Sequence, residues 1–378
     1  MRRGLVRLLL SLGSGLLLAV VAEAALRLFN PLDIDARMYV FHPARKETLA
    51  PNFRGTFKGI PVWTSEFGHR VPTTWDKRYG MEKPPGVTRV LVYGDSFAFG
   101  DEWPAEDSFV EQLQQRLDPR FTSLQVLNFG VPGYNPSQMA NYVQETALRF
   151  HPDAVVLQFA DPNDLVPSSP ARTSGLLQGV KAWFRRHWHL YAVVWDVWYH
   201  GRDSELAKAL RRWWSGVPQA TLAAVSSTPP PEAVVREQLL TSATQYYHLR
   251  QTEVEQDGRG WQQAWTSYRE MAVFLTTHDI PFAVLVATPA WDESCGAWAC
   301  QGVTIRYGEI VDVGRPFYQH LAQHLGTLTP YYVSLDQVFG PYRLTELCDG
   351  RGYHYGPTKN AIIASALADE LHRMGIHP

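Results

Sequence analysis

A serine, an asparagine, a histidine and an aspartate, far apart in the chain, are the residue types here that could act together in chemistry. They are Ser96 in "GDSFAFG", Asn163 in "DPNDL", Asp349 and His354 in "CDGRGYHYGPTKN", accompanied by Gly130 and Gly133 in "NFGVPGYN". A hydroxyl attacks a carbonyl only when a base takes its proton and a third group orients that base. Glycine-turn N–H groups and a carboxamide can stabilise the resulting oxyanion. The set therefore predicts nucleophilic acyl transfer.

Apolar runs alternating with amphipathic patterns must position these residues. The expected strands are residues 89–94, 124–130, 153–160, 280–289 and 331–335, and the expected helices are 107–117, 137–150, 260–279, 315–326 and 357–375. This alternation predicts an α/β fold with a doubly wound, flavodoxin-like sheet of five parallel strands. Active sites in such sheets lie beyond the carboxyl ends of the strands. Three of the stretches quoted above, "GDSFAFG", "NFGVPGYN" and "DPNDL", follow expected strands, and "CDGRGYHYGPTKN" precedes the last expected helix. We expect them to meet at one edge.

Three regions are expected besides the central pattern. Residues 30–87 are rich in proline, glycine and charge, which predicts an irregular lead-in with a strand or two, packed on the main domain. The main domain covers residues 88–378. A helical insertion occupies about 165–255, where no buried-strand pattern occurs and aromatic residues are frequent. Those aromatics fit helix packing, or alternatively a lid that stacks on sugar rings or touches lipid headgroups.

Residues 1–29 form an N-terminal membrane anchor or a signal peptide. Arginines precede the apolar run 8–22, and "AEA" at 22–24 is similar to a signal-peptide cleavage site. The alternative is an anchoring helix that continues to Phe29 and keeps its N-terminus in the cytoplasm. Both alternatives place the rest of the chain outside the cytoplasm, either anchored in the inner membrane and facing the periplasm or secreted.

Composition excludes some classes of function. A formal charge of −2 over 378 residues argues against nucleic-acid binding through phosphate contacts. The spacing of cysteines and histidines predicts no metal site. An exported chain permits a disulfide, and Cys295 and Cys300 are close enough in sequence to form one, which leaves Cys348 as the odd cysteine.

The stretches "GDSFAFG", "NFGVPGYN", "PNDL" and "HYGPTKNAIIA" resemble, in this order, the sequence blocks of the SGNH (GDSL-type) hydrolases. The resemblance covers about residues 89–164 and 280–372, and "TSEFGHR" at 64–70 is similar to a lead-in of membrane-anchored bacterial members. It implies that Ser96 is the nucleophile and His354 the base. It also implies an oxyanion hole made by Ser96, Gly133 and Asn163.

Two positions depart from the family pattern. The family usually has its acid three residues before the histidine, where this chain has Arg351. Asp349, five before, is the nearest carboxylate and the expected third member of the triad, with Glu346 as a weaker candidate. The family usually has glycine two before the asparagine, and Asp161 stands there. We expect Asp161 to narrow the pocket or to add a negative charge beside it.

These observations predict a serine esterase that needs no cofactor and acts on an ester-bearing substrate, such as an acylated glycan. One alternative is an O-acetyltransferase that uses the same residues to modify an exported polysaccharide. A second alternative is a carbohydrate-binding protein of the cell envelope with an inactive site. The first two differ only in whether water or an acceptor hydroxyl resolves the acyl-enzyme.

Overall fold

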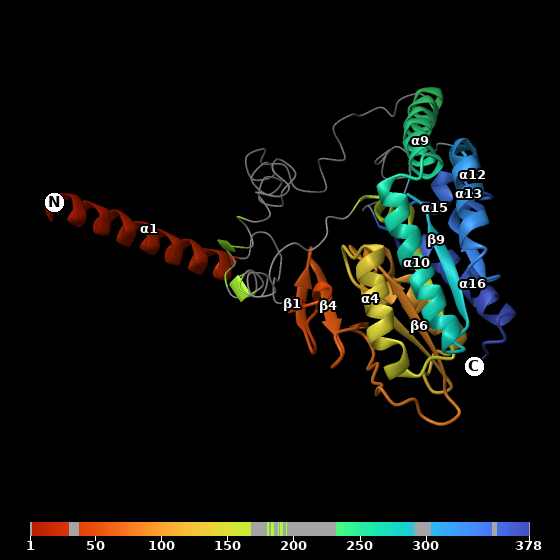
Figure 1. The fold of residues 1–378 in the computed structure, drawn as a ribbon, viewed down its shortest axis with the longest axis horizontal. Helices are drawn as coiled ribbons and strands as arrows, with labels where there is room; N and C mark the ends of the chain where they lie inside the picture. The colour runs from red at the N-terminus through yellow and green to blue at the C-terminus, as the bar shows by residue number, and fades with distance from the viewer. Residues whose placement is uncertain are drawn as a thin grey trace.

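The fold is that of a computed structural model, shown in Figure 1. The described residues are 2–29, 38–167, 232–289, 304–349 and 354–377, together with residues 180, 183, 184, 188, 190, 191, 194 and 291. All statements below concern these residues.

Five parallel strands form the centre of the molecule. They are β6 (Thr88–Gly94), β7 (Leu124–Gly130), β8 (Ala154–Ala160), β9 (Phe282–Ala287) and β10 (Tyr332–Ser334). Their order in the sheet is β10-β9-β8-β6-β7. In chain order this is 2-1-3-4-5 from the β7 side, which is the flavodoxin-like order. The predicted fold class is therefore confirmed.

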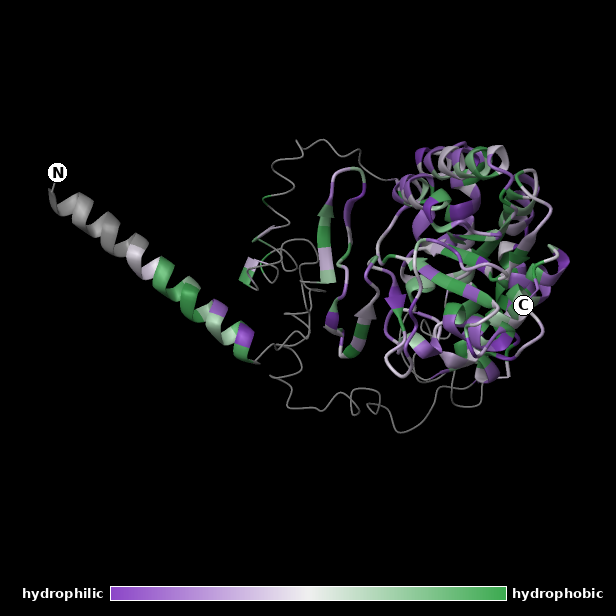
Figure 2. Cartoon of the chain, turned by 90° about the horizontal axis from the view of Figure 1, so that it is seen from below, coloured by the Kyte–Doolittle hydropathy of each residue, from purple (hydrophilic) through white to green (hydrophobic). Residues whose placement is uncertain are grey.

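The strands are mostly apolar and buried because helices cover both faces of the sheet. Every residue of β7 and of β8 is buried. Helices α4 (Pro136–Thr146) and α10 (Arg259–Thr277) pack together in front of the sheet in Figure 1, whereas α3 (Phe109–Leu117) packs against α16 (Pro357–Arg373). Figure 2 shows the apolar strands inside this body and polar residues on its helices.

Further helices follow or flank the strands. They are α2 (Ser96–Phe99), α5 (Asp161–Asp164), α9 (Glu232–Glu255), α12 (Tyr307–Val311), α13 (Arg315–Leu325), α14 (Leu335–Phe339) and α15 (Leu344–Leu347). Of the helical insertion expected at 165–255, α9 is described. Most of the segment between residues 168 and 231, with most of its aromatic residues, lies outside the described residues.

The segment 30–87 is more regular than its composition predicts. Strands β1 (Tyr39–His42) and β2 (Lys46–Leu49) form a hairpin. Strands β3 (Arg54–Phe57), β4 (Ile60–Thr64) and β5 (Arg70–Val71) continue the central sheet as antiparallel strands beyond β7. Where the sequence predicts an irregular lead-in with a strand or two, the structure has five strands. The extra strands were not predicted because β5 pairs with a strand far along the chain and short strands of this kind have little periodicity of their own.

Helix α1 (Arg2–Phe29) is continuous through Phe29, and an ion pair of 2.7 Å joins Arg27 to Glu23 one turn earlier. Among the described residues, no helix has the length and apolar character needed to cross a bilayer. This finding does not support the membrane-spanning helix expected from the sequence. Signal cleavage and the location of the chain stay predictions.

The cysteine pattern also differs from expectation. Cys348 is disulfide-bonded, so it is not the odd cysteine. Cys295 and Cys300 lie outside the described residues. Cys295 and Cys300 would close the shortest ring in the sequence, but a disulfide forms wherever folding brings two sulfur atoms together.

Candidate active site

Ser96 stands at the first position of α2, directly after the end of β6. Asp95 caps the helix by accepting a hydrogen bond from the Phe97 N–H at 2.9 Å. Two glycines allow this turn to pack closely against its neighbours. A Cβ on Gly94 would collide with Gln158 and Ala98, and a Cβ on Gly130 would collide with the backbone of α2. The turn therefore fixes where the Ser96 hydroxyl points.

Asp95 also ties the serine turn to the next strand and to the candidate oxyanion donor. Its carboxylate accepts hydrogen bonds from Gln158 Nε2 at 2.8 Å and from Asn163 Nδ2 at 2.5 Å. Burial raises the pKa of Asp95, and these hydrogen bonds oppose the rise only in part. Because Asp95 bonds to its own turn, to Gln158 and to Asn163, it holds together the loops that carry Ser96 and Asn163.

His354 faces Ser96 from the other end of the sequence. Its Nε2 lies 2.8 Å from Ser96 Oγ, and both residues are buried, with 8% of their surface exposed. The imidazole packs beside the Phe97 ring, with 5.0 Å between the ring centroids. Asn360 in α16 holds the histidine segment by donating from Nδ2 to the Tyr355 carbonyl at 2.7 Å and to the Asp107 carbonyl at 2.8 Å. The expected convergence of serine and histidine is present.

The carboxylate beside His354 is Glu102. Its Oε2 lies 3.3 Å from Nδ1 of the ring and accepts a hydrogen bond from the His354 backbone N–H at 3.3 Å. Burial would raise the pKa of Glu102, but its interactions with His354 and the charge of Lys58 outweigh this and lower the pKa to about 2. Glu102 is therefore an anion held beside the imidazole of His354.

Asp349, the acid expected from the sequence, lies elsewhere. Its Oδ1 accepts a hydrogen bond from the Thr358 N–H at 3.0 Å, in the first turn of α16, so it caps that helix. Glu346, the weaker candidate, accepts from the Arg343 N–H at 2.7 Å. In the sequence, Asp349 and Glu346 are the carboxylates nearest to the histidine, whereas Glu102 lies 252 positions from it. The sequence feature that could have identified this carboxylate is the Asp101-Glu102 pair, at the end of the turn that begins with Ser96.

The predicted oxyanion donors come from three different loops. Asn163 donates one N–H to Asp95, which leaves the second N–H of its carboxamide for a ligand. Gly133 has a left-handed backbone, with φ of +78°, and no atom lies within 4 Å of the position a Cβ would occupy. Pairing of β6 with β7 places Gly94 opposite Gly130, which brings the two turns to the same edge.

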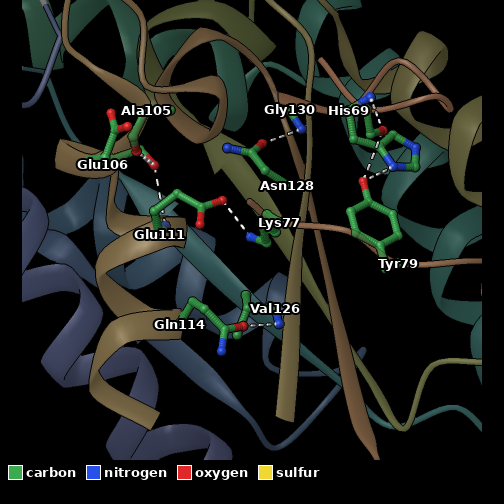
Figure 3. A network of polar contacts seen from close by, with 12 residues as sticks. His69, Lys77, Tyr79, Ala105, Glu106, Glu111, Gln114, Val126, Asn128 and Gly130 are labelled. Carbon is green, nitrogen blue, oxygen red and sulfur yellow. Dashed lines mark hydrogen bonds and ion pairs between the residues drawn. The ribbon is translucent and has the colours of Figure 1, made fainter. Parts of the chain in front are cut away.

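Asn128 fixes the course of the second of these turns. Its Oδ1 accepts a hydrogen bond from the Gly130 N–H at 2.9 Å, as Figure 3 shows. Its Nδ2 donates to the Ala98 carbonyl of α2 at 2.8 Å. One asparagine side chain thus joins the serine turn to the glycine turn that leads to Gly133.

Asp161 is fully buried and neither narrows a pocket nor faces one as a free charge. Its oxygens accept hydrogen bonds from Tyr246 Oη at 2.8 Å and Tyr318 Oη at 3.1 Å, and Arg250 lies 3.8 Å away. Burial raises its pKa to about 6, although Arg250 and the two tyrosines favour the ionised form. Asp161 joins α5 to α9 and α13, so the expectation for this position is wrong.

In the described part of the chain, no group of three or more histidine, cysteine, aspartate or glutamate side chains could hold a metal ion. The residues brought together are Ser96, His354, Glu102, Asp95 and Asn163. They offer a hydroxyl, an imidazole, two carboxylates and a carboxamide.

No protein-family model matches the chain, and no curated protein matches its sequence. Among solved structures it is similar to a lipolytic protein of the G-D-S-L family from Desulfitobacterium hafniense, with 11% identity over 75% of this chain and 99% of that one. It is also similar to TesA (10% identity, 76% and 99% covered) and to an acetylxylan esterase from Geobacillus stearothermophilus (13% identity, 76% and 96% covered). The TM-score is 0.35 in each case, so we base the function on the geometry of the site.

Proposed function

We propose that this protein is a serine esterase, with Ser96 as nucleophile, His354 as general base and Glu102 as the acid that orients His354. The observation that carries the proposal is the contact of 2.8 Å between Ser96 Oγ and His354 Nε2, with a carboxylate 3.3 Å from the other ring nitrogen. This is the arrangement that activates a hydroxyl for acyl transfer.

In the proposed reaction, Ser96 Oγ attacks the ester carbonyl while His354 Nε2 takes its proton. The Asn163 carboxamide and the backbone N–H groups of Ser96 and Gly133 donate to the oxyanion that forms. His354 then gives the proton to the leaving alcohol. Water attacks the acyl-enzyme by the reverse sequence and releases the carboxylic acid. Glu102 stays ionised and stabilises the imidazolium of both steps.

An extracytoplasmic location belongs to the same proposal. The support is the disulfide at Cys348, because structural disulfides persist in oxidising compartments. The apolar N-terminal sequence, as a signal peptide or an anchor, would take the chain there. Fractionation of cells that express the full chain, followed by protease treatment of intact spheroplasts, tests this part. Protection of the whole chain inside spheroplasts would reject it.

A fluorophosphonate probe and p-nitrophenyl acetate test the reaction. The full chain should be labelled at Ser96 and should release acetate, and Ser96→Ala should lose both properties. The same activity in wild type and Ser96→Ala would overturn the proposal. If acetyl groups pass to an added oligosaccharide faster than to water, the enzyme is an acyltransferase that uses the same residues.

A further inference from the structure

The loop that carries Glu102 has an unusual backbone. Gly100 and Glu102 both have left-handed φ angles, of +78° and +67°. A residue with a side chain rarely adopts this conformation unless the surroundings impose it. The position of the proposed triad acid therefore depends on groups outside its own turn.

Two such groups come from the antiparallel extension of the sheet, β3 to β5. Arg70 of β5 is fully buried and donates hydrogen bonds to the Phe99 carbonyl at 2.7 Å, to the Trp103 carbonyl at 2.6 Å and to the Gly100 carbonyl. Its guanidinium also lies 4.3 Å from the centre of the Phe99 ring. Arg70 thus holds the backbone at both ends of the loop. The position of the Glu102 side chain must depend on another residue.

Lys58 is the residue that reaches that side chain. It stands with Gly59 in the two-residue turn between β3 and β4, and both have positive φ angles, as hairpin turns of this length require. Lys58 Nζ lies 2.8 Å from Asp101 Oδ2 and 3.7 Å from Glu102 Oε1. The other oxygen of Glu102, Oε2, faces His354.

We infer that Lys58 is a positioning residue for the proposed reaction: by binding Asp101 and one oxygen of Glu102, it turns the other oxygen of Glu102 toward His354. This inference rests on the proposed function of Glu102. It makes the β3–β4 hairpin a part of the catalytic apparatus, although the hairpin supplies no group that reacts.

The test is a double-mutant cycle on kcat for p-nitrophenyl acetate with the full chain. Lys58→Met should lower kcat about tenfold, the size of effect expected for residues in contact, with little change in KM. Lys58→Arg should restore most of the loss. In a Glu102→Gln background, Lys58→Met should change kcat by less than about twofold, because Lys58 acts through Glu102.

Lys46→Met is the matched control, since Lys46 is an exposed lysine that also has a positive φ and begins strand β2 of the β1–β2 hairpin. It should leave kcat unchanged. Equal losses from Lys58→Met in both backgrounds would show a general structural role and overturn the inference, as would wild-type activity of Lys58→Met. If Glu102→Gln itself keeps full activity, the triad assignment fails instead, so the two failures are distinguishable.

Discussion

Glu102 and His354 are joined at two points: Glu102 Oε2 lies 3.3 Å from the ring Nδ1 and 3.3 Å from the backbone nitrogen of His354. The backbone contact fixes the histidine segment, and the ring contact fixes the orientation of the imidazole. The turn that begins with Ser96 thus supplies both the proposed nucleophile and the carboxylate beside the proposed base.

Glu102→Gln should lower kcat by about 10³- to 10⁴-fold, because a neutral amide no longer stabilises the imidazolium. Asp349→Ala should instead cost about 1 kcal/mol of unfolding free energy through the lost cap of α16 and leave kcat nearly unchanged. Steady-state kinetics and urea denaturation of both variants check this pair. A reversal, with catalysis lost in Asp349→Ala and kept in Glu102→Gln, would return the triad role to Asp349.

Asn163→Ala should lower kcat by about 10²- to 10³-fold with little effect on KM, the usual result of removing one oxyanion donor. Asn141→Ala serves as the control, because Asn141 is an exposed asparagine of α4. Since Asn163 also bonds Asp95, thermal unfolding of the variant should be measured beside its kinetics. A loss of stability with unchanged kcat would assign Asn163 to the scaffold alone.

Asp161→Asn should change how stability depends on pH. The pKa of Asp161 is about 6 in the folded protein against an ordinary 3.8, so the folded state holds the proton that the unfolded state releases. The protonated side chain of Asp161 contributes about 3 kcal/mol to the unfolding free energy below pH 3.8, and this contribution is lost as pH rises through 6. Urea denaturation between pH 4 and 7 should show wild type losing stability relative to Asp161→Asn. If the difference in unfolding free energy between wild type and Asp161→Asn stayed constant over this pH range, the raised pKa of Asp161 would be contradicted.

Lys77 and Glu111 form a buried ion pair, shown in Figure 3, and removing only one partner should destabilise the protein. Lys77 Nζ lies 2.5 Å from Glu111 Oε1, with at most 1% of either side chain exposed. Burial lowers the pKa of Lys77 and raises that of Glu111. Lys77→Met should lower the unfolding free energy by about 3–5 kcal/mol, because Glu111 is then buried without its counter-charge.

Replacing both partners, Lys77→Met with Glu111→Leu, should recover much of that loss. Lys83→Met is the control, since its ion pair with Asp153 is partly exposed and should contribute about 1 kcal/mol or less. Chemical denaturation of wild type, Lys77→Met, the double variant and Lys83→Met checks this prediction. Equal losses in the single and the double variant would mean that packing, and not charge, decides the effect.

The five parallel strands and their main helices could be predicted because each is a local pattern. A buried parallel strand such as β8 needs an apolar run, and a helix such as α10 needs an apolar face, and both are visible in consecutive residues. That Ser96, Asn163 and His354 lie near strand or helix ends could be predicted for the same reason, whereas their roles in catalysis stay a proposal.

The extension β3 to β5, the acid Glu102 and the disulfide of Cys348 could not be predicted in this way. β5 is two residues long and exists because Arg70 pairs with Asn128 across the sheet. Nothing in the sequence around Asp349 shows that its carboxylate caps α16. That choice is made by where Thr358 lies once the helix has packed.

By itself, the sequence determined which strands are buried and which loops leave their carboxyl ends, because hydrophobic periodicity and turn residues act over a few consecutive positions. Only the tertiary structure decided which carboxylate faces His354 Nδ1 and which lysine faces that carboxylate. Those contacts join residues up to 252 positions apart, and their distances depend on how the whole sheet and its helices pack.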